Sequence, residues 1–303
     1  MNRKTFLKTT LATAAAATVL PSSKLFASPP APKKKDKKDV KLKLSFNEGY
    51  PPGDSLNEKL DFMEKLGVVG LEPGGGGLAG RVNEFQQALR GRNIKISAIC
   101  AGFDGFILAE DPNVRASCIG SMKDILAAAG ELGSVGVVFV PAFNGQKPVM
   151  PHTWETREFL IEQMQELGAY AAQHNTNVIL EPLNRKEAFY LRQVADAASL
   201  CRDINNPGVK CLGDFWHMTF EETSDLGAFV SAGEYIGHVH MASRATRNTP
   251  GEDGDVDCYI NGFKGLKMIG YDGYVSYECG AIGDKNIVGP ASVKLLNEQW
   301  NKA

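Results

Sequence analysis

Apolar residues follow two different periods along residues 40–303, a short one typical of strands and a longer one typical of helices. Segments in which an apolar residue returns every three or four positions indicate amphipathic helices with one buried face. The clearest examples are Leu56, Leu60, Met63 and Leu66 after the capping residues Asp54 and Ser55, and Leu160, Ile161, Met164, Leu167 and Tyr170 after Thr153. The polar residues that precede each segment predict where these helices begin, since their side chains accept hydrogen bonds from free helix amides.

Between the helical segments lie eight short runs of apolar, often β-branched residues, which predict strands. The runs are Lys41–Phe46, Gly67–Leu71, Ile94–Cys100, Val135–Val140, Asn177–Leu180, Val209–Leu212, Ile236–Met241 and Tyr274–Tyr277. Near-continuous apolar strands separated by helices indicate a parallel sheet that helices cover. Eight such units predict one α/β domain over residues 40–303, a (β/α)8 TIM barrel. A doubly wound sheet is the alternative, but Gly74–Gly77 lacks nucleotide-loop spacing, and we interpret it as a flexible loop.

Residues 1–39 differ from the remainder in composition. Met1–Thr10 is basic, Leu11–Leu20 is apolar and rich in alanine, and small residues follow, a succession typical of an export signal peptide over residues 1–27. Arg3-Lys4 resembles a twin-arginine signal with lysine as its second residue, so we expect an exported, periplasmic protein. The alternative is an N-terminal helix of the fold. Residues 28–39, rich in proline and lysine, predict a disordered linker. Ten apolar residues are too few to span a bilayer, so no permanent membrane anchor is expected.

The charge is unevenly divided along the chain. Residues 1–39 contain nine Lys/Arg and two Asp/Glu, a charge of +7, and the remaining residues contain 24 Lys/Arg and 33 Asp/Glu, a charge of −9. Because an acidic globular body repels phosphate backbones, no nucleic-acid partner is expected. The six cysteines have no CxxC spacing, and four of them lie in predicted strands or helices. This arrangement favours buried free thiols over disulfides.

Acidic and histidine residues stand at the ends of four consecutive predicted strands, the fifth to the eighth. Glu181, Asp214, His240 and Glu278 occupy these positions. Because the C-terminal ends of barrel strands form one rim, which carries the active site, we expect the four side chains to lie together. Three carboxylates and one imidazole suit Mn²⁺, Mg²⁺ or Co²⁺ better than structural Zn²⁺, which prefers closed thiolate sites. Four such ligands leave two positions of an octahedral ion open for adjacent oxygens of a hydroxy-ketone.

Each of these residues has a simpler interpretation when it is taken alone. A carboxylate at a strand end is often a helix cap or an ion-pair partner, and a histidine in an apolar strand is often a core residue. Their joint occurrence on four consecutive strands favours the metal site. The neighbouring His238 is expected to face away from His240 and to pack or cap. Trp216 is a candidate for stacking on a ligand, with core packing as the alternative.

The stretch Glu181-Pro182-Leu183-Asn184-Arg185-Lys186-Glu187, followed by Asp214-x-x-His217, His240 and Glu278, resembles the xylose isomerase-like TIM barrel superfamily. The most similar branch contains sugar isomerases and ketose 3-epimerases such as tagatose and psicose 3-epimerases. The intervals agree too, with 33 residues from Glu181 to Asp214 and 26 from Asp214 to His240. The resemblance implies that these four residues hold one divalent metal ion, in the first place Mn²⁺, with Mg²⁺, Co²⁺ or Zn²⁺ as alternatives.

The resemblance also implies roles for individual residues. Glu181 and Glu278 would be the catalytic acid/base pair, and Glu187 and His217 would hold substrate oxygens. An arginine after the seventh strand would contact the substrate, and we assign this role to Arg247, although Arg244 is also near the expected position. Glu72, at the end of the second strand, and Trp216 complete the candidate substrate-binding residues.

The function predicted from these features is that of a metal-dependent sugar isomerase or epimerase. It would remove a proton next to a carbonyl through a metal-stabilised enediolate. A lyase or hydratase acting on a keto-sugar or 3-keto-glycoside would use the same site and is the nearest alternative. An endonuclease IV-like nuclease would need histidines on strands two and three, which the chain lacks, and a non-catalytic sugar-binding barrel is the last alternative. The expected partner is a small-molecule sugar or keto-sugar, and homo-oligomer formation is left open.

Overall fold

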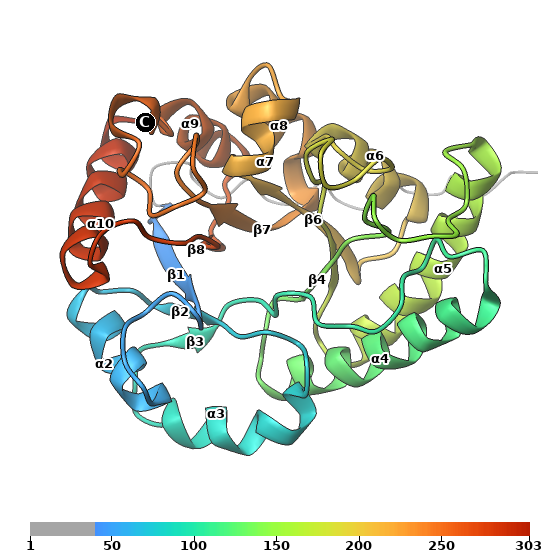
Figure 1. The fold of residues 1–303 in the computed structure, drawn as a ribbon, viewed down its shortest axis with the longest axis horizontal. Coiled ribbons are helices and arrows are strands. Elements are labelled where there is room, and N and C mark those ends of the chain that lie inside the picture. Colours follow the sequence, from blue (N-terminus) through green and yellow to red (C-terminus); the bar gives the residue numbers. More distant parts are fainter. Residues whose placement is uncertain (1–39) are drawn as a thin grey trace, which may run out of the picture. The chain divides into compact units, whose positions relative to one another are not determined.

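The computed structural model describes residues 40–303, so the predicted signal peptide (1–27) and linker (28–39) lie outside the described residues. The described residues form eight parallel strands in the order β3-β2-β1-β8-β7-β6-β5-β4, curved into a barrel with helices on its outside (Figure 1). The strands are β1 (Lys43–Asn47), β2 (Gly70–Glu72), β3 (Lys95–Ile96), β4 (Val137–Phe139), β5 (Val178–Leu180), β6 (Val209–Asp214), β7 (Ile236–Met241) and β8 (Tyr274–Tyr277). The predicted TIM barrel is confirmed.

The helices alternate with the strands along the described chain. They are α2 (Leu56–Lys65), α3 (Val82–Ala88), α4 (Pro112–Glu131), α5 (Trp154–Gln173), α6 (Val194–Ile204), α7 (Phe215–Glu221), α8 (Asp225–Ala232), α9 (Ile260–Ile269) and α10 (Lys285–Lys302), with short 3-10 helices η2 (Leu78–Arg81), η3 (Gly233–Tyr235) and η4 (Gly254–Val256). The two helices predicted most clearly begin where expected. Ser55 caps α2 in a capping box with Glu58, and Thr153 caps α5.

The barrel closes between β3 and β4 through a short seam. The Ile99 amide donates to the Gly136 carbonyl over 2.9 Å, and the Val138 amide donates to the Ile99 carbonyl over 2.9 Å. The predicted third strand, Ile94–Cys100, is regular over only Lys95–Ile96. Beyond Ile96 the chain alternates between partners, because the Cys100 amide bonds back toward β2, at the Pro73 carbonyl, while Ile99 bonds toward β4.

The barrel interior is apolar on one side and polar on the other. Ala98, Val138, Ile179 and Leu212 form a small buried cluster separate from the larger core, which lies between the strands and the helices. Such inward-facing layers fill TIM barrels. The interior side chains from β2, β7 and β8 are instead Glu72, His238 and Ser276, all fully buried. Of the four strands that carry candidate ligands at their ends, β7 and β8 belong to this polar part, whereas β5 and β6 contribute Ile179 and Leu212 to the apolar cluster.

Two findings concern properties that were predicted from composition. All six cysteines are free, as expected, but Cys258 is exposed and Cys100 and Cys279 are partly buried, so the expectation of burial holds for only three of them. Among the described residues, no helix combines the length and the apolar character that crossing a membrane requires.

Candidate metal centre

The four predicted ligands meet at the C-terminal rim of the barrel. Glu181, Asp214, His240 and Glu278 each offer one ligand atom, and these atoms all lie within 4.8 Å of one another. His240 is central, with its Nδ1 atom 3.2 Å from Glu181 Oε1 and 3.5 Å from Glu278 Oε2. Glu181 follows β5 and Glu278 follows β8, so the two glutamates reach the cluster from opposite sides of β6 and β7.

The orientation of His240 is fixed by a buried carboxylate beneath it. His240 Nε2 lies 2.8 Å from Glu72 Oε1, and His238 Nε2 lies 3.1 Å from Glu72 Oε2. Because a carboxylate accepts hydrogen bonds, Nε2 of His240 carries a proton, and Nδ1 is left to face Glu181 and Glu278. A carboxylate behind a histidine in this way is typical of metal-binding histidines, since it fixes the ring and the tautomer.

One prediction about this lower layer was wrong. His238 does not face away from His240, because residues two apart on a strand project to the same side. Both rings bond to Glu72. Glu72, a predicted substrate-binding residue, has no exposed surface, and its two oxygens bond to these two histidines. It is a positioning residue for His240.

One carboxylate oxygen of Asp214 accepts no hydrogen bond from the described part of the chain. Asp214 is the N-cap of α7, and its Oδ1 atom accepts a hydrogen bond from the Trp216 amide over 2.7 Å. This cap directs Oδ2 into the cluster, where it is buried and has no hydrogen-bond partner among the described residues. A buried carboxylate oxygen without a partner is costly, and a cation would satisfy it. The donor set and this oxygen therefore fit a divalent metal ion.

The electrostatics of the cluster support the same conclusion. Burial, reinforced by the neighbouring charge of Glu278, raises the pKa of Asp214 to about 6. Burial also raises the pKa of Glu181. For Glu278, burial alone would raise the pKa, but His240 and Arg247 outweigh it and hold the pKa at about 2. Two buried carboxylates and the half-buried Glu278 thus share one imidazole and the guanidinium of Arg247, and a divalent ion would supply further positive charge.

His217 lies on α7 with its ring directed at Asp214. The Asn184 amide donates to His217 Nδ1 over 3.1 Å, and a backbone N–H can only donate. Nδ1 therefore carries the lone pair and Nε2 carries the proton, and Nε2 lies 3.5 Å from Asp214 Oδ2 and 3.4 Å from Arg247 Nη2. Burial lowers the pKa of His217, in agreement with a neutral ring. His217 thus offers a hydrogen-bond donor to the centre, as a substrate-binding residue would.

Arg247 and Glu187 form the outer wall of the centre. Arg247 Nη2 donates to Glu278 Oε2 over 2.9 Å, and Arg247 Nη1 lies 3.6 Å from Glu187 Oε2. Arg247 adopts a left-handed backbone conformation, with φ of 56°, which is rare for a residue other than glycine. Arg244, by contrast, pairs with Asp225 and lies over the Phe215 ring, away from these carboxylates. The choice of Arg247 over Arg244 agrees with these positions.

Trp216 is half-buried beside Asp214, and its ring packs edge-on against Phe220 at 4.8 Å between centroids. Its indole nitrogen is buried and has no partner among the described residues.

Sequence reasoning missed two residues of the site. Asn184, which also donates to Glu187 over 3.0 Å, lies inside the recognised stretch but received no role. Cys100, whose Sγ atom lies 3.5 Å from Glu278 Oε1, gave no signal, since its partner is 178 positions away.

The fold and this site define a class of protein. Residues 60–295 match the family model described as xylose isomerase-like TIM barrel, and the chain belongs to that family. A relative within the class is the 3-dehydro-D-guloside 4-epimerase of Escherichia coli, which is 30% identical over 239 residues, 77% of this chain and 89% of the relative. A D-psicose 3-epimerase of Ruminiclostridium cellulolyticum is 30% identical over 39% of each chain. These relatives confirm the predicted isomerase class of enzyme.

Solved structures agree with this assignment. The crystal structure of 3-keto-D-glucoside 4-epimerase from E. coli covers 85% of this chain and 100% of its own, with 27% identity and a TM-score of 0.76. D-Psicose 3-epimerase from Clostridium cellulolyticum, solved with D-tagatose, covers 86% of this chain and 96% of its own, with 21% identity and a TM-score of 0.71. At that identity the second likeness shows the fold alone.

Proposed function

We propose that the protein is a divalent-metal-dependent epimerase that inverts a carbon next to the carbonyl of a keto-sugar, with 3-keto-glycosides as the substrate class. The observation that carries the proposal is the ligand cluster, in which Asp214 Oδ2 has no hydrogen-bond partner among residues 40–303 and two glutamates flank His240. The substrate class is supported by the relative that matches most of the chain, whose name specifies a 3-dehydro-glycoside and a 4-epimerase.

The residues of the chain would divide the reaction between them. A divalent ion held by Glu181, Asp214, His240 and Glu278 would polarise the carbonyl and make the neighbouring C–H acidic. One glutamate removes that proton, and the other returns a proton on the opposite face, which inverts the carbon. The positions of Glu181 and Glu278 on opposite sides of the cluster support this two-base arrangement. The Nε2 proton of His217 and the guanidinium of Arg247 would hold substrate oxygens.

The proposal is tested by solvent exchange. The metal-loaded protein is incubated in D₂O with 3-keto-glycosides and free ketoses, and the sugars are examined by ¹H NMR after the metal is removed with a chelator. Deuterium at a single carbon next to the carbonyl, with appearance of the epimer, supports the proposal. Release of the aglycone without an epimer would identify a lyase instead. Elemental analysis should give close to one divalent ion per chain, and Asp214→Asn should lose most of it.

Export is a separate part of the proposal and rests on the composition of residues 1–27. The mature protein from its source would begin near Ser28 and be recovered from the periplasm. Mass spectrometry of the purified protein tests this, and an intact N-terminus on cytoplasmic protein would contradict it.

A further inference from the structure

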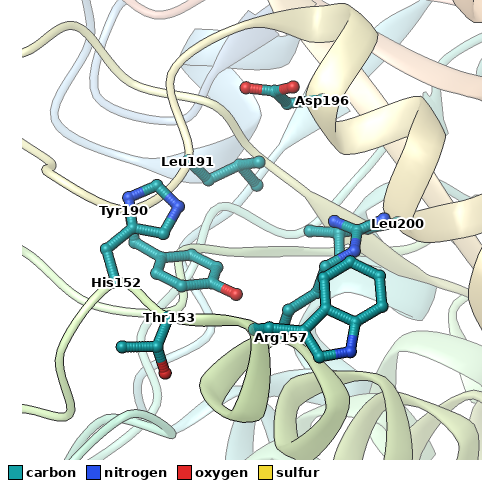
Figure 2. A pocket seen from close by; sticks show the side chains of 8 residues that line it. His152, Thr153, Arg157, Tyr190, Leu191, Asp196 and Leu200 are labelled. Atoms are coloured by element: carbon teal, nitrogen blue, oxygen red, sulfur yellow. The ribbon is translucent and has the colours of Figure 1, made fainter.

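A cavity outside the metal centre opens between the loop before α5 and the loop before α6 (Figure 2). Its volume is about 310 Å³, and His152, Trp154, Arg157, Tyr190, Leu191 and Asp196 are among the residues that line it. This volume lies at the lower end of the range of roughly 300–1,000 Å³ that small-molecule sites occupy. The cavity therefore has the size for a ligand of one ring.

Aromatic side chains form the walls of this cavity. Trp154 is 65% exposed, an unusual degree for the largest apolar side chain. Tyr190 is buried beneath His152, with 4.6 Å between the ring centroids (Figure 2). Aromatic faces of this kind pack against the apolar C–H face of a sugar ring while the edges of the ring remain available for hydrogen bonds.

The polar groups of the cavity fit a neutral ligand. Arg157 donates to Ser199 Oγ over 2.9 Å and pairs with Asp203, so its charge is already compensated. Asp196 adds an exposed carboxylate on the opposite side of the opening (Figure 2). One cation beside two carboxylates does not attract an anion. Donors from Arg157 and acceptors from Asp196 instead match the alternating hydroxyls of a sugar.

The loop before α6 also carries the predicted metal ligand Glu181, and the loop before α5 contacts it. The Leu183 amide donates to the Leu191 carbonyl over 3.1 Å, and Leu183 is two residues beyond the ligand Glu181. With about 3.3 Å per extended residue and about 5 Å between paired chains, the backbone at Leu191 lies roughly 10 Å from Glu181. On the other loop, the Asn144 amide donates to the Glu187 carbonyl over 2.8 Å. A ligand longer than one sugar ring could therefore extend from the centre toward the cavity.

We propose that this cavity is a second carbohydrate subsite, which binds a neutral pyranose unit separately from the sugar at the metal centre. Only the idea that both units belong to one glycoside rests on the proposed function. Binding at the cavity itself needs neither a metal nor a carbonyl group, so it is measured independently of turnover.

The binding test uses methyl α-D-glucopyranoside, which has no carbonyl, with saturation-transfer NMR and a titration of the full chain. Trp154→Ala should weaken binding at least about tenfold, equivalent to about 1.4 kcal/mol, and Asp196→Asn should weaken it less. Ile287→Ala and Glu298→Gln remove an exposed apolar and an exposed acidic group on α10, and they should bind as the wild type does. Asp214→Asn should also leave binding unchanged, because it alters only the metal centre.

Three results would overturn the subsite. They are a wild type without saturable binding, a Trp154→Ala variant with unchanged affinity, and displacement of the glycoside by inorganic phosphate, which would indicate an anion site. A separate measurement tests whether one ligand extends from the metal centre into the cavity. Trp154→Ala should raise KM for a keto-disaccharide but not for a keto-monosaccharide, and an equal effect on both would contradict one continuous site. If neither the wild type nor any variant exchanges the substrate C–H proton with solvent, the proposed reaction is contradicted, whereas the binding result at the cavity is unaffected.

Discussion

At the scale of single residues, the most informative contact is that between Glu72 and His240. Glu72→Gln should weaken metal binding by about 10- to 100-fold, because the amide no longer favours the His240 tautomer that turns Nδ1 toward the cluster. Metal affinity is measured by competition with a chromophoric chelator, and circular dichroism checks that the variant folds. Glu48→Gln is the matched control, since Glu48 pairs with Arg81 outside the cluster. Wild-type affinity in a folded Glu72→Gln protein would show that Glu72 has no part in the site.

The two glutamates that flank His240 should behave differently when each is replaced by glutamine. Glu181→Gln and Glu278→Gln, both saturated with metal, should each lose about 10²- to 10⁴-fold in turnover. Each variant should retain exchange of the C–H proton with solvent from one epimer alone, because each base serves one face. Deuterium incorporation from each epimer in turn measures this. Exchange from both epimers in one variant and from neither in the other would indicate a single base.

The sequence identified the four residues of the candidate metal site but not the contacts that orient them. Glu181, Asp214, His240 and Glu278 could be predicted because each stands at a strand end, and a barrel brings strand ends together. Cys100 and the pairing of Glu72 with two histidines could not be predicted in this way. Their partners are 166 to 178 positions away, and the contacts depend on side-chain rotamers inside the barrel.

At the scale of elements, strand identity was predicted better than strand length. The runs of apolar residues marked every strand, and β7 and β8 have the predicted bounds. The interpretation of Gly74–Gly77 as a flexible loop was wrong in part. Gly74 pairs with Cys100, and a Cβ atom on Gly75 would lie 2.0 Å from the Ala101 carbonyl oxygen. The close approach of two chain segments requires glycine there, and such an approach leaves no mark in the hydrophobic pattern.

Glu252 joins the loop after β7 to the loop before α10. Its carboxylate accepts hydrogen bonds from the Gly283 amide over 2.7 Å and the Thr249 amide over 3.0 Å. Partial burial acts to raise the pKa of Glu252, but these bonds outweigh it and lower the pKa. Since the folded pKa lies below the unfolded one, the stabilisation is present above the usual pKa of 4.5 and is lost as the pH falls through the folded value.

Glu252→Gln should therefore lower the free energy of unfolding by about 1 kcal/mol at neutral pH, a modest value because the group is only partly buried. The difference from the wild type should shrink as the pH falls below 4.5. Urea unfolding of the variant and the wild type, at neutral pH and at the lower pH, measures this difference in the free energy of unfolding. Glu298→Gln, which alters an exposed pair with Lys294 on α10, should leave stability unchanged at either pH. A loss of stability that is the same at both pH values would contradict a role for the charge.

At the scale of the whole molecule, the pairing between neighbouring strands is not equally extensive around the barrel. β6 and β7 pair from Cys211 to Asp214, whereas the seam between β3 and β4 rests on an isolated bridge between Ile99 and Val137. Proteins open locally where few ordered contacts hold them, so the seam should separate at a lower cost in free energy than the rest of the sheet. Opening there would expose the chain near Cys100, which lies against Glu278.

Native-state hydrogen exchange makes this difference in local stability visible. The amide protons of Ile99 and Val138 should exchange with solvent deuterium sooner than those of β6 and β7, through an opening smaller than global unfolding. Mass spectrometry of peptides from the two regions compares them, and equal protection would contradict the idea of a weak seam. If metal binds at Glu278, its addition should slow exchange at the seam. A ligand bound at the rim would then stabilise the seam between β3 and β4 against local opening, at the place where the barrel wall opens most readily.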